Sequence, residues 1–232
     1  HLSTLKSSLP FLHFFDGFRT SHEIQKIEMI SYEQILSLID EKDIQNHRKQ
    51  ALNPTHPHLR GSAQNPDIYF QITESANKYY DNVADIVQEQ MKIVSNLTNR
   101  KYDLFDYVGN DDATSIIVMM GSGSETAQEV VDYLNKKDKK VGLLKVRLFR
   151  PFSIKHFIEK IPKTVQRIAV LDRTKENGAI SEPLCMDVKT AFYNQKNKPI
   201  IIGGRYGLGG KDFTPSMVGA VFDNLNSDSP RD

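Results

Sequence analysis

A turn crowded with polar side chains follows the apolar segment Pro10–Phe15, which has the pattern of a buried strand. Within eight positions the turn holds Asp16, Arg19, Thr20, Ser21, His22 and Glu23. A loop that leaves a buried strand in this way often carries functional groups. The run Ser21–Glu23 does not make a catalytic triad, because adjacent side chains diverge while a nucleophile and its base must lie within hydrogen-bond reach. The loop therefore either closes a cleft or forms an ion-paired turn that packs against the next domain.

A glycine-rich turn, GSGSE at Gly121–Glu125, lies between an apolar run and a helical pattern. Backbone N–H groups at such a position can hold a phosphate, which makes Gly121, Ser122 and Gly123 a candidate anion turn. The spacing is neither that of a dinucleotide-binding loop nor that of a P-loop. Ser122 and Glu125 fit a capping box instead. The sequence favours a structural cap, and the anion turn is the alternative.

Two further polar clusters follow later strands. Asp172, Arg173, Lys175 and Glu176 follow an apolar run, at the edge of the sheet where α/β proteins bind ligands. These charges equally fit a cluster of ion pairs or a contact with a partner domain. The second cluster, Gly203–Gly210, matches no known phosphate loop, and we expect its glycines to let the backbone turn sharply before Thr214.

Metal, nucleic-acid and membrane functions are not indicated by the composition. His56 and His58 lack the further ligands that a metal site needs, so no metal site is predicted. The net charge of +1 gives no attraction to nucleic acid, and no apolar run reaches the ~18 residues that span a bilayer. Cys185 is the single cysteine, which fits a reducing compartment and cannot ligate an iron–sulfur cluster with its about four cysteines.

Strands and helices alternate in the second part of the chain. Apolar runs predict strands at Ser115–Met120, Val141–Leu148, Arg167–Leu171 and Pro199–Ile202. Helical patterns at about 124–137, 154–161 and 183–194 lie between these runs, and Thr214-Pro215 starts a last helix. This alternation predicts an α/β domain with a mainly parallel sheet and flanking helices.

The first part of the chain has a weaker pattern. We expect a helix at the start, a second short strand near Gln25–Met29, and a helix capped by Ser31 that buries Ile35, Leu36 and Ile39. Residues 53–75 carry three prolines with little periodicity, which predicts a long loop that is either functional or lies across a partner surface. A helical pattern then runs from about 76 to 99, and we place a domain boundary near residue 78. The chain opens in helical pattern without an initiator Met, so we expect it to be a piece of a longer polypeptide.

Several long segments resemble one known family. They are PFLHFFDGFRTSHEIQKIE, NPTHPHLRGSAQNPDIYFQ, FDYVG, KVRLFRPF, VLDRTKENGA and GGRYGLGGKDFTPSMV. Together they are similar to pyruvate:ferredoxin oxidoreductase and its relative pyruvate:NADP⁺ oxidoreductase, over nearly the whole chain. The resemblance implies that residues 1–77 are the end of the domain that binds the thiamine pyrimidine. It implies that residues 78–232 are an α/β domain like the C-terminal domain of transketolases.

The resemblance also implies an activity for the parent enzyme. Members of this family use thiamine diphosphate and Mg²⁺ to decarboxylate pyruvate, pass electrons through iron–sulfur clusters and make acetyl-CoA. The implied partners are the other domains of the same polypeptide, a second copy in a homodimer, and ferredoxin or a fused NADP⁺ reductase. A cytoplasmic location is implied, with an organelle not excluded.

The family's catalytic residues have no counterparts in this chain, so the resemblance assigns it no catalytic residue and no bound cofactor. Arg19, Thr20 and His22 are candidates for the edge of the active-site cleft or for a domain contact. The expected role is that of a scaffold between domains. The alternative is an α/β module that binds CoA or another anion at Gly121–Gly123.

Overall fold

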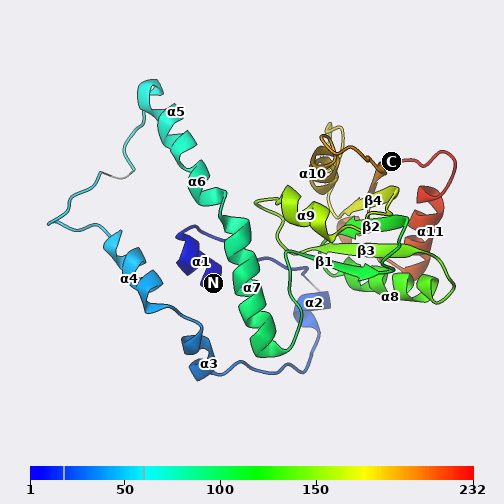
Figure 1. The fold of residues 1–232 in the computed structure, drawn as a ribbon, viewed down its shortest axis with the longest axis horizontal. Coiled ribbons are helices and arrows are strands. Elements are labelled where there is room, and N and C mark those ends of the chain that lie inside the picture. The colour runs from blue at the N-terminus through cyan, green and yellow to red at the C-terminus, as the bar shows by residue number, and fades with distance from the viewer. Residues whose placement is uncertain (18, 60) are drawn as a thin grey trace. The chain divides into compact units, whose positions relative to one another are not determined.

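The computed structural model describes residues 1–17, 19–59 and 61–232, with the side chain of Arg19 outside the described part. The chain divides into two compact units. The first unit holds His1–Phe14 and Ile24–Asp103, and the second holds Phe15–Glu23 and Leu104–Asp232 (Figure 1). The short segment Phe15–Glu23 thus belongs to the second unit although both of its flanks belong to the first.

Five strands form one sheet in the described part of the second unit. They are β1 (Phe105–Gly109), β2 (Ser115–Met119), β3 (Val141–Val146), β4 (Arg167–Asp172) and β5 (Ile200–Arg205). Their spatial order is β1-β3-β2-β4-β5. β1 runs antiparallel to β3, and every other pair is parallel, with Ser115 opposite both Val141 and Arg167. The predicted α/β class with a mainly parallel sheet is confirmed.

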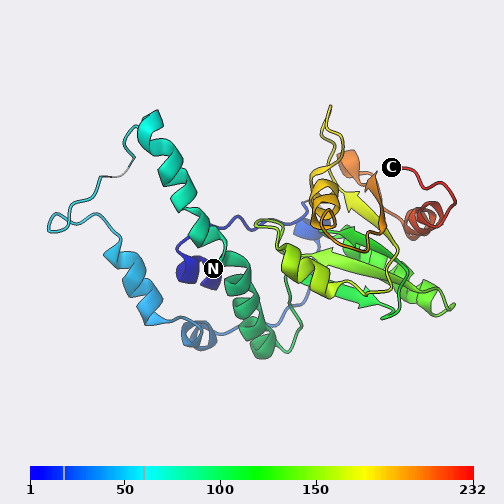
Figure 2. The same ribbon diagram turned by 45° about the horizontal axis from the view of Figure 1, so that its top comes forward.

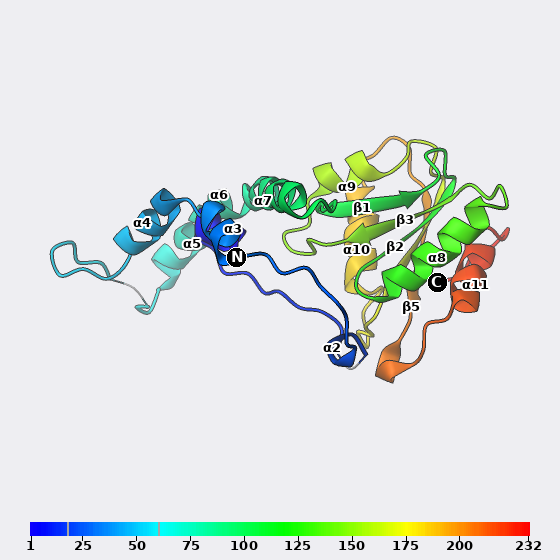
Figure 3. The same cartoon turned by 90° about the horizontal axis from the view of Figure 1, so that it is seen from below.

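Helices cover both faces of this sheet, as the central strands require when they are buried on both sides. The helical segments of the second unit are α2 (Arg19–His22), α8 (Gly123–Asn135), α9 (Ile154–Lys160), α10 (Pro183–Ala191), η1 (Leu208–Gly210) and α11 (Pro215–Leu225). α8 and α11 pack together on one face, while α9 and α10 lie on the other (Figure 1, Figure 3). α10 and α11 each have a proline in the first turn. Proline is favourable there because the N–H that it lacks would have no partner within the helix.

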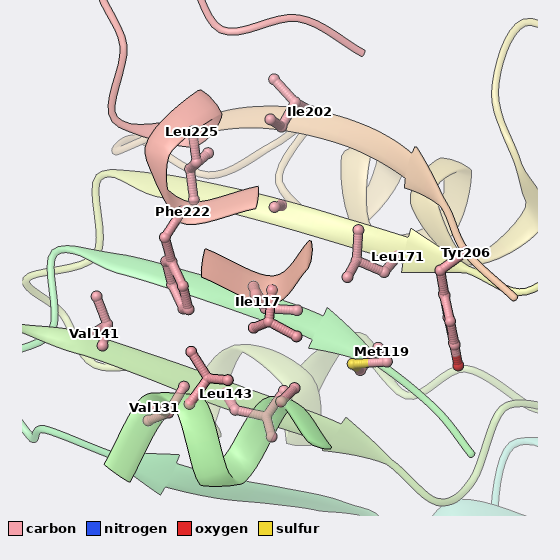
Figure 4. Close-up of a cluster of buried hydrophobic side chains, with 14 residues drawn as sticks. Ile117, Met119, Val131, Val141, Leu143, Leu171, Ile202, Tyr206, Phe222 and Leu225 are labelled. Atoms are coloured by element: carbon pink, nitrogen blue, oxygen red, sulfur yellow. The ribbon is translucent and has the colours of Figure 1, made fainter. Parts of the chain in front are cut away.

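The main core lies between the sheet and the α8–α11 layer (Figure 4). Ile117 of β2, Leu143 of β3 and Leu225 of α11 are each 0% exposed. Side chains alternate across the sheet, so Ile116 and Leu144 face the other layer. That layer holds a cluster of aromatic rings whose centroids lie 5.1–6.1 Å apart: Phe105, Phe152, Phe157 and Phe192.

The first unit is built from helices in its described part. They are α1 (Leu2–Ser7), α3 (Tyr32–Ser37), α4 (Glu41–Lys49), α5 (Pro66–Ser75), α6 (Asn77–Tyr80) and α7 (Val83–Thr98). α1 packs against α7, and α7 ends at Asn99, whose left-handed backbone terminates the helix (Figure 2). Of the described helices of either unit, none has the length and apolar character of a membrane-spanning segment.

Three expectations for the first part of the chain are wrong. Pro10–Phe15 and Gln25–Met29 form no strands, because a strand needs a neighbouring strand and neither segment belongs to the sheet of the described residues. The region 53–75 is not all loop, because α5 begins at Pro66 with Asn65 as its N-cap. The capping box at Ser31 is confirmed, with Ser31 and Gln34 bonded in both directions. The helix it starts nevertheless leaves Leu36 67% exposed, so the predicted burial is wrong.

The second unit holds one strand that the sequence pattern did not predict. β1 (Phe105–Gly109) is short and ends in glycine. In the described sheet it pairs with β3 alone, in an antiparallel register that places Phe105 opposite Val146 and Gly109 opposite Gly142. Its pairing is therefore non-local. The four predicted strands each appear as β2, β3, β4 and β5, with ends shifted by one to three residues.

Candidate functional site

The carboxyl ends of β2 and β4 form the place in this sheet where ligands bind in many α/β proteins. β2 leads into α8 on one face, whereas β4 leads toward α10 on the opposite face (Figure 3). The two loops therefore diverge, as they do at the topological switch point of an open sheet. The Gly121–Gly123 turn follows β2, and Arg173 follows β4. We refer to this place as the switch-point crevice.

The carboxylate of Asp16 lies in the switch-point crevice. One oxygen, Oδ2, accepts a hydrogen bond from the backbone N–H of Ser122, and the other, Oδ1, lies 2.7 Å from a guanidinium nitrogen of Arg173. Gly121 has φ +83°, and a Cβ there would lie 2.9 Å from Oδ2. Only glycine therefore lets the backbone approach the carboxylate without a clash. The candidate anion turn holds a negative charge from the same chain.

Tyr206 and Arg173 each donate a hydrogen bond to a backbone carbonyl at the switch-point crevice. The Tyr206 hydroxyl donates to the carbonyl oxygen of Met120 over 3.0 Å, and Arg173 Nε donates to the carbonyl oxygen of Gly207 over 3.4 Å. Burial, with the Asp16 charge as a second cause, raises the pKa of Tyr206 to about 12. Tyr206 is thus a neutral hydrogen-bond donor at physiological pH.

The electrostatics of Asp16 favour its charged form. Partial burial acts to raise the pKa of its carboxyl, but the hydrogen bonds from Ser122 and the charge of Arg173 outweigh burial. The net result is a pKa below the ordinary value. Asp16 is therefore ionised in the folded protein and acts only as an acceptor.

A second pair of acids lies at the same edge of the sheet. Asp172 is 4% exposed and accepts hydrogen bonds from the backbone N–H groups of Leu184 and Cys185, in the first turn of α10. Burial is the main cause that raises its pKa. Glu182 is 3% exposed and accepts from Arg205 over 3.0 Å. These acids hold the helix start and the edge strand in place.

The polar residues after β4 make contacts within the chain. Arg173 pairs with Asp16, Lys175 lies 3.6 Å from Glu182, and the N–H of Glu176 donates to Glu182 over 2.8 Å. The charges thus form a cluster of internal ion pairs and hydrogen bonds.

The predicted capping box at Ser122 and Glu125 is wrong. Ser122 has helical backbone angles, and its side chain makes no cap hydrogen bond. Glu125 instead pairs with Lys145, at 2.7 Å. Because Lys145 is 9% exposed, its ammonium needs a partner, and Glu125 is the carboxylate it reaches.

The other predicted site residues are close to Asp16 in the sequence. Those whose side chains are described are exposed on the protein surface. Thr20 and His22 are exposed in the short helix α2, and the side chain of Arg19 lies outside the described residues. The Oγ atom of Ser21 lies 3.0 Å from Nδ1 of His22, within an exposed four-residue helix. Asp16, which the sequence showed only as one polar residue of the turn, is the member that reaches Gly121–Gly123.

The remaining motifs hold no built site in the described residues. His56 and His58 are exposed, and the described residues contain no group of three metal-ligating side chains. The glycines of the second cluster turn the backbone as expected, since Gly207, Gly209 and Gly210 all have positive φ. The shallow, polar hollow beside Gly109 and Lys136 is wide open and carries no convergent groups.

Two family models match the chain, one after the other. The model "Pyruvate flavodoxin/ferredoxin oxidoreductase, thiamine diP-bdg" matches residues 1–92. The model "Pyruvate:ferredoxin oxidoreductase core domain II" matches residues 113–218. The chain belongs to the pyruvate:ferredoxin oxidoreductase family, as its sequence motifs indicated.

Individual relatives agree with this family along the whole chain. A pyruvate-flavodoxin oxidoreductase from Klebsiella pneumoniae is 58% identical over 232 residues, and the pyruvate:ferredoxin oxidoreductase of Moorella thermoacetica is 57% identical over 231. A pyruvate dehydrogenase [NADP(+)] from Cryptosporidium parvum is 53% identical over 234 residues. The chain spans 20% of the length of the first two relatives and 12% of the third.

A solved structure shares the fold at low sequence identity. The 2-oxoglutarate:ferredoxin oxidoreductase from Magnetococcus marinus matches with a TM-score of 0.51 and 17% identity, over 75% of this chain and 27% of that chain. At this identity the match supports the fold alone. A transketolase from Pichia stipitis matches with a TM-score of 0.34, over 53% of this chain. The predicted likeness to a transketolase C-terminal domain stays a prediction.

Proposed function

We propose that this chain is a non-catalytic part of a thiamine diphosphate-dependent pyruvate oxidoreductase. The observation that carries the proposal is the 58% identity to a pyruvate-flavodoxin oxidoreductase over all 232 residues, at 20% of that enzyme's length. In the parent enzyme, pyruvate would be decarboxylated and joined to CoA, and the electrons would pass through iron–sulfur clusters. The acceptor would be ferredoxin, flavodoxin or a fused NADP⁺ reductase.

We infer two roles within the parent. Residues 1–77 would complete the domain that holds the thiamine pyrimidine, and residues 78–232 would supply an α/β scaffold for contacts between domains and within a homodimer. The thiamine-diphosphate-binding family model, which matches residues 1–92, supports the first role. The match of core domain II to residues 113–218 supports the second. The boundary near residue 78 is part of this proposal.

The geometry of the second unit supports a scaffold rather than a cofactor site. The backbone donor of Ser122 and the guanidinium of Arg173 are both used by Asp16. Among the described residues, no three His, Cys, Asp or Glu side chains gather where a metal ion could bind. We propose that the catalytic groups and cofactors of the parent lie on its other domains. Arg19, Thr20 and His22 would lie at the edge of the cleft or in a domain contact.

A direct assay tests the proposal. The isolated chain, incubated with pyruvate, CoA, thiamine diphosphate, Mg²⁺ and an artificial electron acceptor, should produce no acetyl-CoA above background. The full-length enzyme under the same conditions should turn over. Turnover by the isolated chain would show that catalytic residues lie within it. No turnover by the full-length enzyme with pyruvate would remove the proposed substrate.

The alternative function, an α/β module that binds CoA or another anion at Gly121–Gly123, is not favoured. An incoming anion would have to displace the carboxylate of Asp16 from Ser122 and Arg173. A thermal-shift titration decides between the two functions, because a ligand that binds the folded state raises its stability by RT ln(1 + [L]/Kd). We expect a flat response to CoA and to inorganic phosphate. A saturable rise in melting temperature would favour the binding module.

A further inference from the structure

The segment Phe15–Glu23 has an unusual place in the chain. It belongs to the second compact unit, while His1–Phe14 before it and Ile24–Asp103 after it belong to the first. The chain therefore leaves the first unit for nine residues and returns.

The described side chains of the segment differ in their exposure. Phe15 is 67% exposed, and the described residues Thr20–Glu23 are all exposed. Asp16 differs from these, because its side chain is 18% exposed and reaches into the switch-point crevice. The hydrogen bond to Ser122 and the ion pair with Arg173 therefore make Asp16 an attachment point of the segment on the second unit.

The crevice is built to accept a carboxylate. The N–H of Ser122 stands at the first turn of the 13-residue helix α8, where the helix dipole favours negative charge. Arg173 approaches from the loop after β4, 2.7 Å from the carboxylate, and is itself positioned by the Gly207 carbonyl. Gly121 provides the space, because any Cβ there would meet the carboxylate. The loops after β2 and β4 thus converge on one side chain, and the loop after β5 holds Arg173 through Gly207.

We propose that Phe15–Glu23 is an intramolecular clasp, and that Asp16 is the positioning residue that fastens it to the switch-point crevice. The clasp sets the position of the segment that carries Arg19, Thr20 and His22. It also explains why a crevice of the type that binds ligands in other open sheets has its donors already in use. The inference concerns the attachment of the segment and does not depend on the proposed enzymatic activity.

Hydrogen exchange of the full-length protein, followed by mass spectrometry, tests the role of the Asp16 charge. Asp16→Asn keeps the size of the side chain but removes its charge. Amides of residues 15–23 should exchange about tenfold faster or more, as expected for the loss of hydrogen bonds to a charged group. The exposed Asp228→Asn is the control with the same change of net charge. Equal exchange of the segment in the two variants would overturn the clasp.

A matched pair of glycines tests the geometry independently of charge. Gly121 and Gly178 have φ of +83° and +85°, so alanine strains the backbone similarly at both. Only at Gly121 would the new Cβ meet Asp16, because nothing lies within 4 Å of the position at Gly178. Gly121→Ala should release residues 15–23 to faster exchange, and Gly178→Ala should not. The same exchange of the segment in both variants would contradict the clasp.

Chemical rescue identifies the carboxylate as the functional group. Asp16→Ala leaves the Ser122 N–H and the Arg173 guanidinium facing a gap. Formate supplies a free carboxylate and should restore local order at the crevice, seen as recovered exchange protection of Ser122 and its neighbours. Chloride at equal ionic strength should not. Protection that formate leaves unchanged would overturn the assignment to the carboxylate, and so would equal rescue by chloride.

Discussion

The two compact units differ in where their apolar side chains lie. In the second unit, the strands β2 and β3 are buried along their whole length, and Phe157, Leu184 and Leu225 are each 0% exposed. In the described part of the first unit, the buried apolar side chains are Val83, Ala84 and Val87, all in α7. Its other segments show large apolar side chains to solvent, and Leu12 is 86% exposed.

The contrast shows that an apolar pattern leads to burial only where a neighbouring strand or helix layer can cover it. In the second unit each strand finds a neighbour within the same α/β alternation, so sheet and helices bury each other. In the first unit the apolar residues of α3 and α5 have no such layer opposite them in the described residues. The same residue types therefore contribute much to stability in one unit and little in the other.

The largest effect expected from this comparison comes from truncating an aromatic core residue. Phe157→Ala should lower the free energy of unfolding of the second unit by about 3–5 kcal/mol, because Phe157 packs edge-on against Phe105 and Phe192. Phe70→Ala in α5, where Phe70 is 69% exposed, should change stability by less than ~0.5 kcal/mol. Urea unfolding followed by circular dichroism measures both, since the chain has no tryptophan. Similar losses of unfolding free energy in the two variants would contradict the contrast between the two units.

A smaller effect is expected when a Gly→Ala substitution adds a single methyl group within the second unit. A Cβ at Gly123 would lie 2.6 Å from Cε2 of Tyr206, so Gly123→Ala should cost about 1–3 kcal/mol. Gly219 lies inside α11 with nothing within 4 Å of the new Cβ, so Gly219→Ala should gain about 0.5–1 kcal/mol. Thermal unfolding should therefore move in opposite directions for the two variants. A shared direction would mean that close packing at the carboxyl edge of the sheet is not what Gly123 provides.

The pH dependence of the clasp is a subtler effect. Because the folded-state pKa of Asp16 is lowered, its contribution is present above the unfolded-state pKa of about 3.9 and is lost as pH falls through the folded-state value. Tyr206 stays neutral over this range, whereas Asp172, whose pKa burial raises, is a second acid at this edge of the sheet that also takes up a proton as pH falls. Exchange of residues 15–23, corrected for intrinsic rates, should accelerate in acid. Asp16→Asn should abolish that acceleration, and an unchanged acid response would exclude Asp16 as its source.

The smallest predicted change lies in the first unit. Ser31→Ala removes the capping box of α3 and should cost up to ~1 kcal/mol of local helix stability. Amides of α3 should exchange faster, while the thermal unfolding of the second unit stays unchanged. Ser37→Ala is the control, because Ser37 lies in the last turn and donates only to the carbonyl oxygen of Gln34. A shift of the second unit's transition would show that the two units are coupled through α3.

Much of the second unit could be predicted because its signals are local. Unbroken apolar runs gave four of the strands, and Thr214 with Pro215 gave the start of α11. β1 was missed because five residues that end in glycine give a weak pattern, and their pairing with β3 is non-local. α5 was missed although Asn65 and Pro66 form a usable start signal, since the prolines around it suggested a loop.

The candidate site could be predicted only in part. The sequence indicated Gly121–Gly123 as a candidate anion turn, the alternative to a structural cap. Nothing in the sequence identified the carboxylate of Asp16 as the anion. Asp16 and Arg173 are 157 residues apart and follow no shared motif. Ser122 and Glu125 fit the capping box by spacing, and the box failed because Lys145 from a neighbouring strand takes Glu125.

The amino-acid sequence by itself determined the family, the α/β class and the strands β2, β3, β4 and β5, because long motifs and hydrophobic periodicity depend only on neighbours along the chain. Tertiary structure alone decided which apolar segments are buried and which charge enters the turn after β2. Both outcomes depend on groups brought together from distant positions, and a contact across 106 residues, such as that between Asp16 and Ser122, leaves no trace in local spacing.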